Sequence, residues 1–458
     1  MKGLCTILLI LLAASPAGAA TRAKTEQPVD KDKLAAEVKT EFLHAWHGYR
    51  QYAWGHDDLA PLSRKPHDWY AQHSLLMTPV DALDTLLLMG LQDEADAARE
   101  LIASKLDFNQ DIEVKNFEIT IRLLGGLLSG YQLTGDERLL RKAEDLGTRL
   151  LPVFDSPTGL PYVNVNLHTG KTRGAETNPA ETGTLLLEFG VLSKLTKREE
   201  FYAKAKRALL ETWKRRSPIG LVGSSINVDT GQWVDRESHI SGGIDSYYEY
   251  LWKCWRLFGD QECRDMWQPS IEAANRYLAD DVDGALWYGY ADMDSGKRTH
   301  SYYGALDAFF PALLALSGDT ARAARLQDSS FHMWQLHGIE PEVIDYRTSK
   351  IPYPGYALRP EIVESTYYLY HYTHDPKYLA MGRTLWRDFV KYCRTDAGYA
   401  ALVDVVSKKK KDRMESFVLA ETFKYYYLLF APETVLDFDA VTFNTEAHPL
   451  RAAPKPAK

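Results

Sequence analysis

Apolar residues recur along this chain at helical spacing, and the helical segments come in pairs. In each pair a first segment rich in Leu and Tyr ends at a short polar turn, and a more amphipathic segment begins directly after it. Gly or His ending one helix, followed by Asp capping the next, suits a helical hairpin. The clearest turns are Gly135-Asp136, Gly259-Asp260, Gly318-Asp319 and His374-Asp375.

Three weaker turns raise the number of predicted hairpins to seven. They fall near Gln92-Asp93, Thr196-Lys197 and Ala431-Pro432. The later turns recur about every 60 residues, a period that fits a helix pair plus a long loop. The pattern therefore predicts an all-α fold of repeated hairpins, stacked either as an open superhelix or as a closed toroid.

Acidic residues decide between these two arrangements. The leading helix of nearly every pair is apolar yet carries carboxylates near its start. They are Asp81, Asp84, Glu118, Glu181, Asp245, Glu249, Glu361, Glu364 and Glu421. Burial of one unpaired carboxylate costs several kcal/mol, so repeated burial without purpose is implausible. A closed toroid would gather these groups at one end of its axis, around an acidic, water-filled pocket.

A simpler interpretation exists for any single pair of charges. Glu118 and Arg122 are four residues apart and can form an ordinary ion pair on one helix. Such pairs are common and weak, so one of them carries no functional information. They do not account for acidic residues in helix after helix, and the pocket remains the preferred interpretation.

Composition limits the class of protein and its partners. The 458 residues are 45% hydrophobic and 25% charged, which allows a large buried core. The formal net charge of −8 argues against a nucleic-acid partner. No linker interrupts the helical pattern, so we expect one catalytic domain over residues 21–450, a disordered tail over 451–458, and a monomer.

The start of the chain predicts export. Residues 1–20 combine a positive start, an apolar stretch and a small-residue cleavage site, which together indicate a secretory signal peptide. No later segment is long and apolar enough to cross a membrane. We therefore expect a secreted or periplasmic protein.

Cysteine usage is sparse. Outside the predicted signal peptide the chain has Cys254, Cys263 and Cys393, an odd number that is no disulfide framework. Cys254 and Cys263 can pair, but both also suit a buried helix face. The favoured interpretation is that they are free and act as small hydrophobic residues.

The predicted carboxylate ring has an obvious chemistry. Paired carboxylates in a pocket are the machinery of glycoside hydrolysis, in which one donates a proton and another activates water or attacks carbon. The sequence contains no nucleophile elbow, P-loop, HExxH or CxxC motif. So many carboxylates also suit a hard cation such as calcium, although no EF-hand pattern is present. Most aromatic residues near these segments suit the core because of their size, and some can stack on sugar rings; they are Trp54, Trp69, Tyr70, Tyr247, Tyr248, Tyr302, Tyr303 and Phe417. His300 can line the pocket or serve a structural role.

Several motifs resemble glycoside hydrolase family 47, the class I α-mannosidases. They include VDALDTLLLMG, NFEITIRLLGGLLSGYQLTGD, DSYYEYLWK, LRPEIVESTYYLY, MESFVLAETFKYYYLLF and FNTEAHP, and they cover nearly the whole mature chain. The resemblance implies an (α/α)7 barrel that trims terminal α-1,2-linked mannose with inversion and depends on Ca²⁺. With the signal peptide, it suggests a bacterial-type member acting on α-mannoside oligosaccharides.

The resemblance also implies residue roles. Glu118 matches the general acid, acting through a bridging water, Glu361 matches the general base, and Asp245 matches a third catalytic carboxylate. Thr445 matches the direct calcium ligand. Inversion implies catalytic carboxylates about 6.5–9.5 Å apart, with room for water. The remaining matches to substrate-binding residues are Arg122, Glu181, Glu249, Glu364, Phe417 and Glu421.

Two positions depart from the family pattern. Ala308 stands where a cysteine of a pair common in eukaryotic members is expected. Gly243 stands where endoplasmic-reticulum enzymes that remove one particular mannose carry arginine, which leaves the branch specificity open.

Alternative functions are a mannose-binding lectin of the same fold, another helical-toroid glycosidase, or a polysaccharide lyase. A lectin could dispense with an acid or base and a lyase needs basic residues, whereas all three catalytic carboxylates are present and the pocket is acidic.

Overall fold

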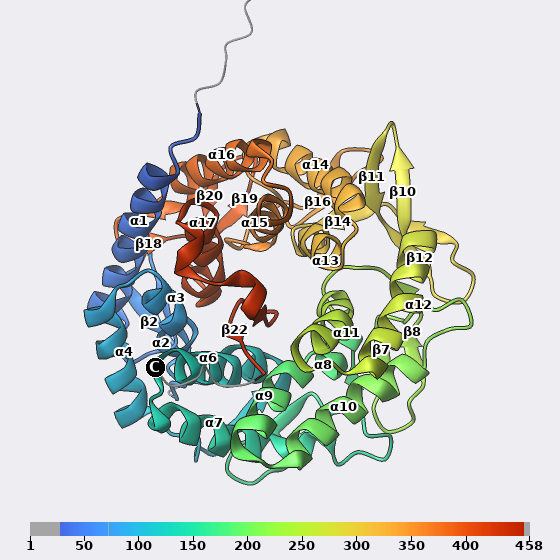
Figure 1. Ribbon diagram of the computed structural model, residues 1–458, viewed down its shortest axis with the longest axis horizontal. Helices are drawn as coiled ribbons and strands as arrows, with labels where there is room; N and C mark the ends of the chain where they lie inside the picture. The colour runs from blue at the N-terminus through green and yellow to red at the C-terminus, as the bar shows by residue number, and fades with distance from the viewer. Residues whose placement is uncertain (1–27, 72, 453–458) are drawn as a thin grey trace, which may run out of the picture.

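The chain forms a closed ring of helical hairpins around a central axis (Figure 1). The computed structural model describes residues 28–71 and 73–452. The predicted signal peptide and most of the predicted tail lie outside these residues. Neighbouring inner helices pack against one another around the ring, and α3 against η4 completes the circle. This confirms the predicted all-α (α/α)7 barrel.

Seven inner and seven outer helical segments make up the ring within the described residues. The inner segments are α2 (Met77–Asp81) with α3 (Leu83–Leu88), α5 (Asn116–Ile119) with η1 (Thr120–Leu124) and α6 (Gly125–Thr134), α8 (Pro179–Gly183) with α9 (Leu186–Thr196), α11 (Asp245–Phe258), η3 (Leu306–Phe309) with α13 (Phe310–Leu316), α15 (Glu361–Thr373), and η4 (Val418–Thr422) with α17 (Phe423–Phe430). The outer helices are α1 (Lys31–Tyr52), α4 (Gln92–Lys105), α7 (Glu137–Leu150), α10 (Glu199–Lys214), α12 (Gln261–Tyr277), α14 (Thr320–His337) and α16 (Pro376–Cys393).

The predicted turns lie where the inner helices meet the outer ones. Gly135 ends α6 in the left-handed conformation, and the Asp136 side chain accepts a hydrogen bond from the Arg138 amide at the start of α7. Asp260 and Asp375 cap α12 and α16 in the same way. The turn at 431–432 differs from the prediction, because no outer helix follows it. The outer partner of α17 is instead α1, from the other end of the chain.

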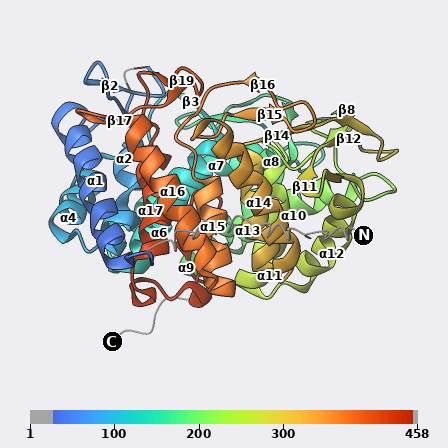
Figure 2. The same cartoon turned by 90° about the horizontal axis from the view of Figure 1, so that it is seen from above.

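Short antiparallel strands connect each outer helix to the next inner one. They gather on one face of the ring, and the hairpin turns lie on the opposite face (Figure 2). The inner helices therefore all begin on the strand side. The strands are β1 (Asp58–Ala60), β2 (Lys65–His67), β3 (Glu113–Lys115), β4 (Asn164–Asn166), β5 (Thr172–Arg173), β6 (Glu176–Thr177), β7 (Ser225–Asn227), β8 (Trp233–Asp235), β9 (Glu237–Ser238), β10 (Ala279–Val282), β11 (Ala285–Tyr288), β12 (Tyr290–Asp292), β13 (Arg298–His300), β14 (Tyr302–Gly304), β15 (Val343–Asp345), β16 (Lys350–Tyr353), β17 (Arg394–Thr395), β18 (Gly398–Tyr399), β19 (Leu402–Asp404) and β20 (Lys409–Lys410).

The C-terminal segment enters the ring from the hairpin-turn side. After α17 it forms the short helices η5 (Glu433–Val435) and η6 (Phe438–Ala440), then a hairpin of β21 (Thr442–Phe443) and β22 (Pro449–Leu450). The hairpin lies inside the ring of inner helices (Figure 1). Its tip, residues 444–448, is almost wholly buried and closes the barrel.

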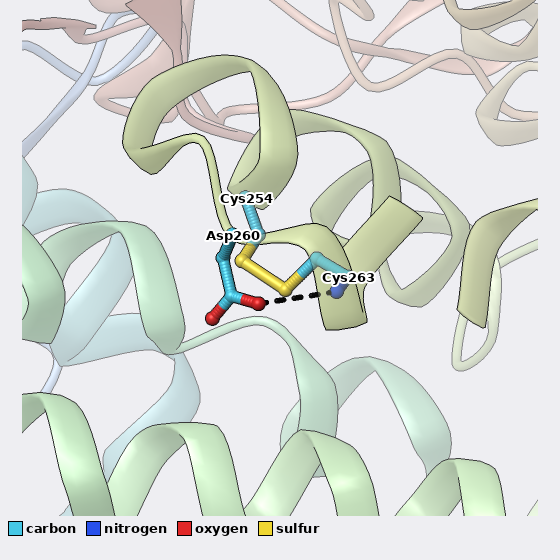
Figure 3. Close-up of side chains that lie close together, drawn as sticks. All are labelled: Cys254, Asp260 and Cys263. Atoms are coloured by element: carbon cyan, nitrogen blue, oxygen red, sulfur yellow. Dashed lines mark hydrogen bonds between the residues drawn. A yellow bond between two sulfur atoms is a disulfide. The ribbon is translucent and has the colours of Figure 1, made fainter. Parts of the chain in front are cut away.

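The cysteines correct one prediction. Cys254 on α11 and Cys263 on α12 form a disulfide, with Cα atoms 6.0 Å apart (Figure 3). The turn at Gly259 and Asp260 folds the two helices against each other, so residues nine apart in sequence meet. The favoured interpretation of free cysteines was therefore wrong for this pair. Cys393 is free and buried.

Among the helices of the described residues, none has both the length and the apolar character to span a membrane.

Candidate active site

A pocket extends from the strand side of the ring, where Lys115 lines it, to the hairpin tip, where Thr445 and Glu446 line it. Its volume is about 280 Å³. All ten residues that the sequence singled out for catalysis, substrate binding and metal binding line this pocket: Glu118, Arg122, Glu181, Asp245, Glu249, Glu361, Glu364, Phe417, Glu421 and Thr445. They come from five inner segments and from the hairpin, which only a closed ring can bring together.

Glu118 and Arg122 lie on either side of the point where their inner helix changes from α-helical to π-helical geometry. Glu118 lies at the end of α5, and Arg122 lies in η1, a π-helical turn. Such turns often occur at functional sites because they reposition side chains. Arg122 donates to Glu118 Oε2 at 3.0 Å and 3.1 Å and also contacts Glu446 at the hairpin tip. The ion pair expected from spacing therefore exists, but as part of the pocket rather than of an exposed helix surface.

Asp245 and Glu361 each begin an inner helix of the pocket wall, and η3 with α13 lies between these two helices in the ring. Asp245 is the first residue of α11, and its Oδ1 accepts the Ser246 amide at 2.7 Å. Glu361 is the first residue of α15, and its Oε2 has no hydrogen-bond partner among the described residues. Burial raises the pKa of each carboxyl to about 7. A pKa near neutral pH suits groups that accept or donate protons.

Two further acids crowd the lower wall. Burial, with repulsion from Glu249 next, raises the pKa of Glu364 to about 8. Burial and then repulsion from Glu446 and Glu361 hold the pKa of Glu421 well above its usual value. Glu249 differs because it forms an ion pair with buried Lys253. The wall thus contains more acidic groups than cations to neutralise them.

The remaining predicted residues complete the sides of the pocket. Glu181 accepts from Lys115 Nζ at 2.8 Å and from the Thr177 hydroxyl at 3.0 Å. The Phe417 ring lies between two guanidinium groups, with the Cζ atoms of Arg122 at 5.6 Å and Arg359 at 5.9 Å from its centroid. These contacts fix an aromatic face beside the carboxylates, an arrangement that suits a sugar ring.

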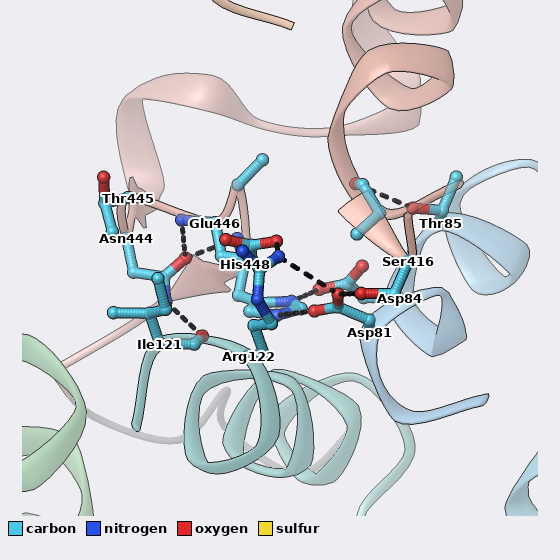
Figure 4. Close-up of polar contacts among 12 residues, drawn as sticks. Asp81, Asp84, Thr85, Ile121, Arg122, Ser416, Asn444, Thr445, Glu446 and His448 are labelled. Atoms are coloured by element: carbon cyan, nitrogen blue, oxygen red, sulfur yellow. Dashed lines mark hydrogen bonds and ion pairs between the residues drawn. The ribbon is translucent and has the colours of Figure 1, made fainter. Parts of the chain in front are cut away.

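The hairpin tip that carries Thr445 is anchored to several inner helices (Figure 4). Asn444 Nδ2 donates to the Ile121 carbonyl at 2.9 Å and to Glu188 at 2.7 Å, and the Tyr250 hydroxyl lies 3.3 Å from the Thr445 amide. The tip can approach η1 and α6 closely because Gly125 lies there. A Cβ at Gly125 would come within 2.6 Å of Asn444 Nδ2.

A second charged cluster, which we call the floor, joins His448 of the tip to Asp81, Asp84 and Lys424 of the inner segments. His448 bridges Asp84 at 2.7 Å and Asp81 at 3.2 Å, and Lys424 Nζ lies 2.8 Å from Asp84 Oδ1. All four side chains are essentially inaccessible to solvent. Burial alone would favour neutral acids, but attraction to Lys424 and His448 outweighs it and lowers the pKa of Asp84 to about 2.

The donor atoms at the pocket base fit a hard cation. Thr445 Oγ1 has no hydrogen-bond partner among residues 28–71 and 73–452, and it faces the pocket with Glu249, Glu364, Glu421 and Glu446. A hydroxyl and a carbonyl, with carboxylates able to hold bound waters, form an oxygen donor set of the kind that calcium prefers. Within the described chain, one group of Cys, His or acidic side chains is tight enough to bind a metal directly. It is Cys254, Asp260 and Cys263, in which the two sulfurs are bonded to each other.

Sequence reasoning missed several residues that hold the tip. They are Glu188, Tyr250, Lys424, Asn444, Glu446 and His448. The sequence held a signal for Glu188 and Lys424, since each is a charged residue within an apolar helical run. Asp81 and Asp84 were recognised as part of the ring, but they belong to the floor rather than to the pocket wall. Gly243, at the pocket rim, has a φ of +94°, so an arginine there would be strained.

Comparison with known proteins gives consistent matches across the chain. The family model described as glycosyl hydrolase family 47 matches residues 41–452. Alpha-mannosidase I MNS4 of Arabidopsis thaliana is 40% identical, over 94% of this chain and 72% of the plant protein. The human ER degradation-enhancing alpha-mannosidase-like protein 2 is 38% identical, over 91% and 77%. The structure of an alpha-1,2-mannosidase from Trichoderma reesei superposes with a TM-score of 0.85 at 28% identity, covering 92% of this chain and 99% of the fungal one.

Proposed function

The chain belongs to glycosyl hydrolase family 47 and is a glycoside hydrolase, and on that premise we propose that it is an exo-acting, inverting α-1,2-mannosidase. Its proposed substrates are terminal α-1,2-linked mannose residues of mannosides or high-mannose glycans. Relatives named for this activity or for alpha-mannosidase activity support the reaction class. The named relatives come from a plant, a human and a fungus, so the bacterial-type assignment stays a prediction.

One observation carries the proposal: ten predicted residues from distant parts of the chain line one pocket that is closed at its base. A pocket closed by the hairpin tip admits the end of a glycan rather than its middle, which favours exo-action. Its acidic wall, with acids near neutral pKa, suits general acid and general base chemistry.

In the proposed reaction each carboxylate has one task. Glu118 donates a proton, through a water, to the leaving glycosidic oxygen as the bond from that oxygen to C1 breaks. Glu361, which keeps one oxygen unpartnered, takes a proton from the water that forms the new C1–O bond on the opposite face. Asp245 is the third catalytic carboxylate, and its negative charge would favour the positive charge that develops at C1.

We also propose that Thr445 holds Ca²⁺ at the pocket base, through its hydroxyl and carbonyl and through waters. Bound there, the cation would hold sugar hydroxyls and supply positive charge. Glu249, Glu364, Glu421 and Glu446 would orient the waters, while Arg122, Glu181 and Phe417 position the sugar.

A lectin of the same fold is the second candidate, because a relative's name refers to ER degradation enhancement rather than to hydrolysis alone. Retention of Glu118, Asp245 and Glu361 in one pocket favours hydrolysis.

The protein is further proposed to be exported. Its disulfide supports this, because disulfides persist mainly in oxidising compartments.

A panel of mannobioses tests the proposal. We expect the enzyme to cleave α-1,2-mannobiose in preference to the α-1,3, α-1,4 and α-1,6 isomers, to stop when a chelator is added, and to resume with calcium. Sugar release is measured by chromatography. Binding of mannobiose without cleavage at any linkage would support the lectin instead. Activity that is unchanged by the chelator would show that the reaction does not need the cation.

A further inference from the structure

Four aromatic rings form a cluster beside the pocket that the proposed reaction does not use. His239 stacks on Tyr290 with centroids 4.3 Å apart, Tyr302 lies 6.1 Å from Tyr290, and His300 lies 5.0 Å from Tyr302. His239 is buried, Tyr290 and Tyr302 are partly exposed, and the His300 side chain is 45% exposed. The cluster thus runs from the interior to the surface. We call its three accessible rings, Tyr290, His300 and Tyr302, the aromatic ledge.

Local strand pairing explains why these rings share one side. In the three-stranded sheet β13-β12-β9, Tyr290 pairs directly with His300, so both side chains project from the same face. Tyr302 follows His300 by two residues, the spacing that returns a side chain to that face in extended chain. The backbone register therefore places the three ledge side chains on one face.

The ledge adjoins the pocket through the two segments that enter its wall. β9 leads within a few residues to Gly242, and β14 leads to Leu306, both of which line the pocket. These two residues touch, since a Cβ at Gly242 would lie 2.7 Å from Leu306 Cδ1 and 4.0 Å from Asp245 Oδ2. Burial, followed by the charges of Asp307 and other acids that include Asp245, raises the pKa of Tyr290.

Packing alone does not explain the ledge. Neighbouring Tyr288 and Tyr303 are fully buried and already serve the core, whereas the ledge rings keep surface in contact with solvent. Burial lowers the pKa of His239 to about 4, so the ring beneath Tyr290 is uncharged at neutral pH. Glu237 lies at the outer end, where its Oε1 is 3.9 Å from His300 Nε2. Partly exposed rings with a carboxylate at their edge match what a pyranose needs, a flat apolar face and hydrogen-bonding groups beside it.

We propose that the aromatic ledge is a subsite for a third sugar ring, one that belongs to an oligosaccharide whose terminal mannose occupies the pocket. This inference rests on the proposed function and deepens it, because it names the surface that would hold a sugar beyond the two joined by the cleaved bond. The first two rings fill the pocket and its rim, and the third stacks on Tyr302 and Tyr290. The chain would then select glycans by length as well as by linkage.

Kinetics on two substrates test the ledge. In Tyr302→Ala and His300→Ala we expect kcat/KM for an α-1,2-linked mannotriose to fall about three- to tenfold. The value for α-1,2-mannobiose, which does not reach the ledge, should remain at the wild-type level. Tyr302→Phe keeps the ring and should keep most of the mannotriose rate. The matched control is Tyr131→Ala, a partly exposed tyrosine near the hairpin-turn end of α6, which should change neither substrate.

Other results would contradict the proposal that the ledge is a sugar subsite. An equal fall for both substrates would indicate damage to the pocket, and no fall for either would show that the third sugar lies elsewhere. A wild-type enzyme that cleaves neither substrate would contradict the proposed function, and the ledge is then tested by binding. Calorimetry with the Glu118→Gln protein should show weaker mannotriose binding once Tyr302→Ala is added, and unchanged affinity would reject the subsite.

Discussion

Two groups of buried acids in this barrel are in opposite electrostatic states. In the floor, Asp81 and Asp84 contact His448, Asp84 also contacts Lys424, and the pKa of Asp84 falls to about 2. In the pocket wall, Glu364 and Glu421 have few cationic neighbours, and burial raises their pKa values. Buried carboxyl groups thus serve two purposes.

The difference separates what holds the site from what the site does. Paired charges in the floor fix the hairpin tip and, with it, Thr445. Acids in the wall with few cationic neighbours, such as Glu364 and Glu421, remain free to exchange protons, hold water or bind a cation, at a cost in folding free energy. Substitutions in the wall should therefore change rate, and substitutions in the floor should change stability.

The largest expected effect comes from the wall. Glu118→Gln removes the proton donor while keeping its size, so kcat for α-1,2-mannobiose should fall by about 10²–10⁴. The melting temperature should stay close to that of the wild type. The control is Glu113→Gln on β3, where the glutamate pairs with exposed Arg173. Wild-type turnover in Glu118→Gln would remove this residue from the reaction.

Next in size is a substitution in the floor. Lys424→Met leaves Asp84 with one cation fewer in a site without solvent, which should cost about 3–5 kcal/mol of unfolding free energy. Denaturant titration measures the loss, and Lys105→Met at the exposed end of α4 is the matched control. A floor variant with wild-type stability would show that the paired cluster does not anchor the tip.

A smaller effect is expected from the disulfide, which lies at the far end of α11 from Asp245. Cys254→Ala with Cys263→Ala should lower the unfolding free energy by about 2–3 kcal/mol, the chain-entropy value for so short a loop. The kcat of the folded protein should hardly change. A reductant should lower the unfolding free energy of the wild type and leave that of the double variant unchanged. An equal loss in both proteins would contradict a stabilising Cys254–Cys263 disulfide.

The smallest effect is the dependence of stability on pH. Burial opposes the charge on His448, but Asp84 and Asp81 outweigh it and raise its pKa to about 9, above the unfolded value of about 6.5. This contribution is complete below pH 6.5 and is lost as the pH rises through 9. Between pH 7 and 9 the loss should be on the order of 2 kcal/mol. His448→Gln should flatten this part of the stability curve, and an unchanged slope would assign the effect to another group.

Local chemistry made much of the fold predictable from sequence. The turn at Gly135 and Asp136 depends on residues a few positions apart, so it was visible without the structure. The acids at the helix starts were equally visible, because each is a polar residue in an apolar run. That these acids meet in one pocket could be predicted only by assuming that the hairpins close into a ring.

Contacts between distant residues could not be predicted in this way. His448 meets Asp84 across 364 residues, and α1 pairs with α17 from opposite ends of the chain. The Cys254–Cys263 bond depends on the angle at one turn, and the sequence left two interpretations open. The tip contacts of Asn444 likewise required the hairpin to be placed inside the barrel.

Proton NMR of the first product is the most direct test of the central claim. Wild-type enzyme with calcium is mixed with the methyl α-glycoside of α-1,2-mannobiose, whose blocked reducing end cannot contribute free anomers, and the anomeric signals of the released terminal mannose are followed before mutarotation. An inverting hydrolase with water activated by Glu361 must release β-mannose first, and the α-anomer should appear only later. Initial release of α-mannose would contradict inversion and the roles assigned to Glu118 and Glu361.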